Sequence, residues 1–138
     1  MDERNWHWSL PCDPRMVSTA RRNVAAAVSD VDRDTVEIAL LLTSEVVTNA
    51  LRYGDTSSLS LSLRLRPDEL LVEVDDATVQ QPQVRLPRQL DERGRGLMLL
   101  DALASEWGSD AKADGKTVWF RLALTTPVIE GSPLARHP

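Results

Sequence analysis

Cysteine is nearly absent from this chain, which has one, Cys12, among 138 residues. A single cysteine cannot form an internal disulfide, so the composition favours a reducing compartment, the cytoplasm. No apolar run approaches the roughly 20 residues that a membrane-spanning helix needs. The opening MDERNWHWSL also lacks the apolar core of a signal peptide. The net charge of -5 disfavours nucleic acid or an anionic membrane as a partner.

Several common site motifs are missing as well. No second histidine or cysteine stands at zinc-binding spacing, so a structural zinc is not expected. The patterns G-x-x-x-x-G-K-[ST] and G-x-G-x-x-G do not occur, which excludes the common phosphate-loop and dinucleotide-binding domains. The length suits one domain with a real core. We expect that domain over residues 1–124 and a loose tail over 125–138, where periodicity is lost.

The hydrophobic pattern predicts the elements of the first half of the chain. NWHWSL alternates as a short strand. A helix is expected from Pro14 to about Val28, with Asp13 as its N-cap and proline at the first helical position. A second, longer helix should be capped by Asp34 or a neighbour and end at Gly54.

The pattern in the second half of the chain predicts two hairpins with a loop and a helix between them. SSLSLSLRLRP alternates strictly and should form a hairpin with LLVEVDD. A long loop without clear period, residues 77–93, separates this hairpin from a helix over LMLLDALASEW and a last hairpin of WGSDAK and KTVWFRLAL. This order predicts an α+β fold, a two-layer sandwich of a mixed, mostly antiparallel sheet with three helices on one face.

The long helix carries a polar pair, Glu45 and Asn49, on an otherwise apolar stripe. The opposite stripe is apolar too, so the helix should be packed on two sides. Burying a carboxylate and an amide without partners is costly, which favours a bound cation or polar ligand beside them. A polar pair near a helix end, bonded to nearby backbone, is the equally open alternative.

Three further motifs are weak evidence for a ligand site when each is taken alone. Asp75 and Asp76 end a strand, where a carboxylate can accept a hydrogen bond from an exocyclic amine or simply belong to a turn. Gly94, Arg95 and Gly96 precede a helix, whose N-terminal amides can contact phosphate. Thr117 near the start of the last strand is by itself an ordinary strand residue.

Together, the four motifs resemble those of the GHKL superfamily of ATP-binding domains, and more closely those of the bacterial anti-sigma-factor serine/threonine kinases. EVVTNALRYG is similar to the family's asparagine box, and VEVDDAT stands where the family has its adenine-binding aspartate. RGRGLMLLDALASEWG is similar to the glycine-rich phosphate box, and GKTVWFRL to the closing threonine strand.

The resemblance implies a role for each matching residue. Asn49 would ligate magnesium, and Glu45 would be the general base or orient water. Asp76, favoured over Asp75, would accept the adenine amine, and Thr117 would bond near the adenine. The phosphate-binding residues would be Gly94, Arg95, Gly96 and Leu97, with residues 77–93 as a lid.

The implied cofactors are ATP and magnesium, and the implied activity is transfer of the terminal phosphate of ATP to a serine or threonine of a STAS-type anti-sigma antagonist. A sigma factor is the second implied partner. The tryptophan-bearing first strand has two interpretations, packing in the core or forming the interface of a homodimer. Thr78 and Tyr53 depart from the family's usual glycine and histidine. They keep open an alternative, a nucleotide-gated module that sequesters a sigma factor or other regulator without kinase turnover.

Overall fold

The computed structural model describes residues 3–53, 56–78, 98–113 and 115–124. The helices are α1 (Met16–Ala27) and α2 (Arg33–Tyr53), and residues 98–103 are also helical. The strands are β1 (Arg4–Leu10), β2 (Thr56–Leu65), β3 (Glu69–Thr78), β4 (Glu106–Lys112) and β5 (Gly115–Ala123). No helix within these ranges is long and apolar enough to cross a membrane.

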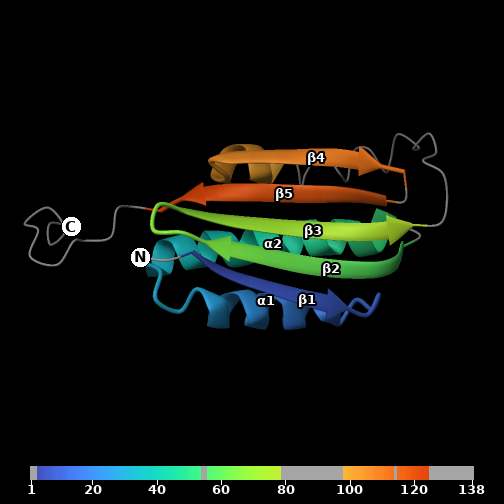
Figure 1. Cartoon of the computed structure of the whole chain (residues 1–138), viewed down its shortest axis with the longest axis horizontal. Coiled ribbons are helices and arrows are strands. Elements are labelled where there is room, and N and C mark those ends of the chain that lie inside the picture. Colours follow the sequence, from blue (N-terminus) through green and yellow to red (C-terminus); the bar gives the residue numbers. More distant parts are fainter. Residues whose placement is uncertain (1–2, 54–55, 79–97, 114, 125–138) are drawn as a thin grey trace, which may run out of the picture.

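The five strands form one sheet in the order β1-β2-β3-β5-β4. Figure 1 shows the helices behind this sheet, with α2 between α1 and the helix of residues 98–103. The predicted α+β sandwich is therefore confirmed. The prediction allowed for a mixed sheet, whereas every strand pairing in the described residues is antiparallel. The predicted tail, 125–138, lies outside the described ranges.

The alternation of leucine and polar residues in β2 determines which side of the sheet meets the helices. The four leucines of β2 are 3% exposed or less: Leu59, Leu61, Leu63 and Leu65. They oppose the even-numbered residues of β3 in the ladder, which therefore share their face. Together these rows form the helix-facing side of the core, and the serines between the leucines lie on the open side.

The two tryptophans of β1 lie on the core side. Trp6 opposes Leu63 and Trp8 opposes Leu61, so both indoles share the face of the buried leucines. Both are partly buried and pack against the core. Of the two roles that the sequence left open, the structure supports core packing.

The start of α1 differs from the prediction. The helix begins at Met16 rather than Pro14, and Asp13 bonds the turn before it by accepting a hydrogen bond from the backbone nitrogen of Arg15 at 2.8 Å. Hydrogen bonds from the Arg15 side chain, and then its backbone, lower the pKa of Asp13 to about 2. At the start of α2, Asp32 is the neighbour that caps, since it accepts from the backbone nitrogen of Thr35 at 3.0 Å.

One polar group is buried in the core face of α2. Thr43 is 0% exposed, and its hydroxyl has no hydrogen-bond partner. A buried hydroxyl that has lost its bonds to water and gained none in the protein destabilises the fold.

We therefore expect Thr43→Val to raise the free energy of unfolding by about 1 kcal/mol, because valine keeps the branched shape and removes the unpaired hydroxyl. Urea unfolding at neutral pH measures the change. The control is Thr48→Val, at a half-buried position of the same helix, which should change the free energy by less than about 0.5 kcal/mol. Destabilisation by Thr43→Val would show that the hydroxyl has a partner in solution.

The backbone at the start of β5 lies very close to that of β3. Gly115 has φ +156°, and a Cβ at this position would lie 1.8 Å from the carbonyl oxygen of Asp76. Glycine is needed here because any side chain would collide with the backbone of β3. Gly108 in β4 differs, since its Cβ would meet the indole of Trp119, at 2.7 Å.

Gly115→Ala should lower the free energy of unfolding by more than about 2 kcal/mol, because the clash is with backbone that cannot move without breaking the ladder. Gly108→Ala is the matched control. It should cost less, because the half-buried indole of Trp119 can turn toward solvent. Denaturation midpoints of the two variants, measured side by side, test this order. A larger loss for Gly108→Ala would contradict it.

Candidate functional site

The polar pair of α2 lies on one flank of that helix. Arg21 of α1 donates hydrogen bonds to the Ser44 hydroxyl at 2.6 Å and to the Leu40 carbonyl oxygen at 3.2 Å, so this side of α2 faces α1. At 100° per residue, Glu45 and Asn49 lie on the opposite side, next to the core face. Both are half-buried. The sequence correctly predicts that they share a flank.

This flank is more open than predicted. We expected α2 to be packed on both sides, yet Leu41, on the same flank as Glu45, is 39% exposed. Glu45 also lies well inside the helix, which continues to Tyr53, and the backbone groups around it are paired along the helix. A capping role at the helix end therefore does not suit Glu45, which is half-buried on this flank.

The register of β3 separates its two aspartates. Asp76 opposes the buried Leu59 of β2, so it faces the helix layer, and it is only 6% exposed. Asp75 must point to the open side, because successive strand residues alternate. The structure thus places Asp76, the aspartate that we favoured, on the side of the sheet where α2 lies.

Chain connectivity brings Asp76 and the end of α2 to the same end of the molecule. The helix ends at Tyr53, and β2 begins three residues later at Thr56. The first part of β2 carries Leu59, the ladder partner of Asp76. Figure 1 shows this end on the right, where β3 ends and β2 and β5 begin. Asn49, about one turn before the end of α2, therefore lies toward the same end as Asp76.

Thr117 lies on the other side of the sheet. It opposes Asp75 in the ladder, and its hydroxyl donates a hydrogen bond to Asp75 Oδ1. The ammonium of Lys112 donates to the same oxygen at 2.8 Å. Burial raises the pKa of Asp75, but the hydrogen bonds from Lys112 and Thr117 outweigh it and hold the pKa below its usual value. The structure brings Thr117 to Asp75 and not to Asp76.

One residue near the candidate site was missed from the sequence. Lys116 is the ladder partner of Asp76, so it faces the helix layer from β5. Strands β3 and β5 are not joined by a hairpin, so no turn between them could have indicated this register. The sequence analysis chose Thr117, one residue further along, which belongs to the opposite face.

The predicted phosphate-binding residues Gly94, Arg95, Gly96 and Leu97 lie outside the described residues. The same holds for most of the predicted lid. Its first two residues, Ala77 and Thr78, are the last residues of β3, so the strand continues two residues further than the sequence predicted.

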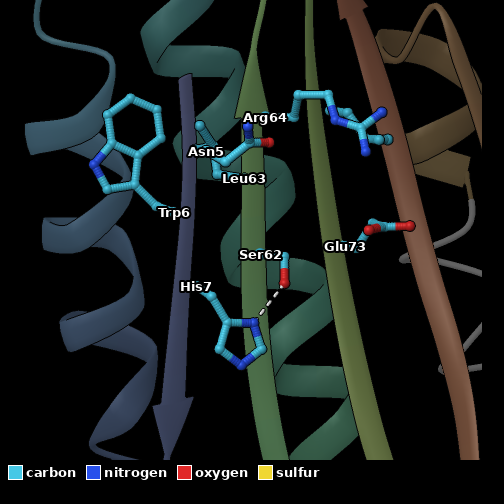
Figure 2. Close-up of a pocket in the computed structure, with 8 residues that line it drawn as sticks. Asn5, Trp6, His7, Ser62, Leu63, Arg64 and Glu73 are labelled. Atoms are coloured by element: carbon cyan, nitrogen blue, oxygen red, sulfur yellow. Dashed lines mark hydrogen bonds between the residues drawn. The ribbon is translucent and has the colours of Figure 1, made fainter. Parts of the chain in front are cut away.

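The open side of the sheet has a hollow of about 340 Å³. Figure 2 shows its lining residues, which come from β1, β2 and β3. His7 Nδ1 and the Ser62 hydroxyl form a hydrogen bond of 2.9 Å there. The hollow lies across the sheet from α2, and none of the predicted site residues lines it.

Comparison with known proteins agrees with this arrangement. The family model of the histidine kinase-like ATPase domain matches residues 10–122, from the last residue of β1 to the penultimate residue of β5. A comparison with curated proteins returned no match. The match covers most of the chain, including α2 with its polar pair and the end of β3, and the chain therefore belongs to the family of histidine kinase-like ATPase domains.

Proposed function

We propose that this ATP-binding domain is a cytoplasmic serine/threonine protein kinase of the anti-sigma-factor type. The observation that carries the proposal is the placement of Glu45 and Asn49 on the flank of α2 away from α1, with Asp76 on the same side of the sheet and toward the same end. A carboxylate and an amide accessible beside a buried acid suit a ligand that has both a polyphosphate and an amine-bearing base.

The residues on the helix-facing side of the sheet have the chemistry needed to hold ATP with magnesium. Asn49 offers a neutral amide oxygen and Glu45 a carboxylate, both oxygen donors of the kind that magnesium prefers. Magnesium bound at Asn49 would neutralise charge on the phosphates. Asp76, only 6% exposed on the helix-facing side of the sheet, would accept a hydrogen bond from the adenine 6-amino group. The residues Gly94, Arg95, Gly96 and Leu97 would contact the phosphates, as the resemblance implies.

The proposed reaction is an in-line displacement. The hydroxyl oxygen of a serine or threonine on the partner attacks the γ-phosphorus, the bond between that phosphorus and the β–γ bridging oxygen breaks, and ADP leaves. Glu45 takes the proton of the attacking hydroxyl. Thr117 does not contact the base in this proposal, because its hydroxyl bonds Asp75 on the open side of the sheet.

The partners remain those that the resemblance implies, a STAS-type antagonist as the phosphate acceptor and a sigma factor as the sequestered protein. A second candidate function is a nucleotide-gated binding module without turnover. Thr78 supports it, since β3 continues through this residue, paired with Thr56, where a glycine would permit a sharper bend after the adenine-binding aspartate.

Nucleotide affinities test the binding site. We expect Asn49→Ala to lose most of the magnesium-dependent gain in ATP affinity, and Asp76→Asn to weaken discrimination between ATP and GTP by about tenfold, the effect of one hydrogen bond to a charged group. Calorimetry with and without magnesium measures both. The controls are Asn5→Ala and Asp75→Asn, which alter the open side of the sheet and should keep the wild-type pattern. Equal affinities for all five proteins would remove the site assignment.

Phosphate transfer tests the kinase proposal. Glu45→Gln should slow transfer from labelled ATP to a cognate STAS-type antagonist by about 100-fold or more, a typical effect of losing a general base, while ATP affinity changes little. Glu37→Gln, at an exposed position of the same helix, is the matched control and should transfer at the wild-type rate. If the wild-type protein binds ATP tightly but transfers phosphate to no antagonist, the binding module is the better description.

A further inference from the structure

Lys116 lies beside the acid that the proposed function assigns to adenine. It opposes Asp76 directly in the β3–β5 ladder, and the next pair along the same face is Val74 and Val118. Both members of the first pair therefore face the helix layer. Lys116 is half-buried, whereas Asp76 is 6% exposed. A charged pair at this position is unusual for a core-facing row that otherwise consists of apolar residues.

The two side chains can act on one ligand. Directly opposed residues of an antiparallel pair have Cβ atoms about 5 Å apart. The two backbones are close at this point, since a Cβ at Gly115 would lie 1.8 Å from the Asp76 carbonyl oxygen. The lysine stem has four carbons, so its ammonium can reach past the shorter aspartate while the carboxylate stays at the sheet.

We propose that Lys116 determines nucleobase specificity together with Asp76, the carboxylate accepting from the adenine 6-amino group and the ammonium donating to adenine N1. The inference rests on the proposed function, since it concerns the same nucleotide. It adds a second base-contacting residue to a site in which the sequence had suggested Thr117 for this position.

The chemistry of the base explains why such a pair selects adenine. The 6-amino group of adenine donates and its neighbour N1 accepts, so a carboxylate beside an ammonium complements this edge. Guanine has the reverse arrangement, an accepting O6 and a donating N1–H. In the same pose it would set a carbonyl oxygen against the carboxylate and an N–H against the ammonium. Leaving such groups unpaired or opposed is strongly unfavourable, which is how a polar site rejects an analogue.

The other lysine of the chain is the natural control. Lys112 is also on the second hairpin, but it bonds Asp75 on the open side of the sheet. Its replacement removes the same charge at a short distance along the chain and leaves the helix-facing side unchanged. An effect of general positive charge would appear in both variants, whereas base contact would appear only with Lys116.

The test compares ATP with 1-deaza-ATP, in which a C–H replaces N1 and the 6-amino group is retained. Wild-type protein should bind 1-deaza-ATP about tenfold or more weakly than ATP, as expected for the loss of one hydrogen bond to a charged group. Lys116→Met should bind ATP about tenfold more weakly than wild type and should not distinguish it from 1-deaza-ATP. Lys112→Met should discriminate as the wild type does. Calorimetry of the full chain gives all the affinities.

Each alternative outcome is decisive. If wild-type protein binds both nucleotides equally, N1 has no partner and the inference is wrong, although ATP binding stands. The same conclusion follows if Lys116→Met still discriminates. If wild-type protein binds no ATP at all, the proposed function fails and the inference fails with it. The wild-type comparison needs no variant, so the test survives even if Lys116→Met does not fold.

Discussion

The leucine row of β2 is the constraint on which the rest of the molecule depends. Its four leucines are almost completely buried, and the antiparallel ladder carries their orientation to both neighbouring strands. A register slip of one residue in β3 would expose its apolar row and turn Asp76 to the open side. The large free energy of apolar burial therefore holds Asp76 on the helix-facing side of β3, the side on which α2 with Glu45 and Asn49 lies.

The sides of helix α2 lie in three different environments. One side meets α1 through the hydrogen bonds of Arg21, one packs on the sheet, and one keeps its polar pair half-exposed. The apolar contacts stabilise the helix along its length, so the polar pair need not contribute to stability. The ion pairs on the open side, such as that of Arg121 with Glu106 at 2.7 Å, are exposed and should each contribute little.

Features set by local pattern could be predicted from the sequence. The period of 3.6 residues was enough to put Glu45 and Asn49 on one flank, and strict alternation was enough to identify β2 and its buried row. Features set by contacts distant in the chain could not be predicted in the same way. The partner of Asp76 depends on the β3–β5 register, which no turn specifies, and so Lys116 was missed and Thr117 was chosen. The start of α1 was misplaced because Asp13 and Pro14 form a turn that resembles a helix cap in sequence.

The end of β3 carries two adjacent aspartates that lie on opposite sides of the sheet. Asp75 is held on the open side by Lys112 and Thr117, and the Asp76 carbonyl oxygen lies so near Gly115 that no side chain fits between them. The backbone of Asp76 thus lies tightly against β5 and the residue is only 6% exposed, so its carboxylate has little room to turn. A carboxylate that is already oriented loses less conformational entropy when it binds a base. The orientation of Asp76 therefore comes from its own burial beside β5, whereas the contacts of Asp75 stabilise the end of the strand from the open side.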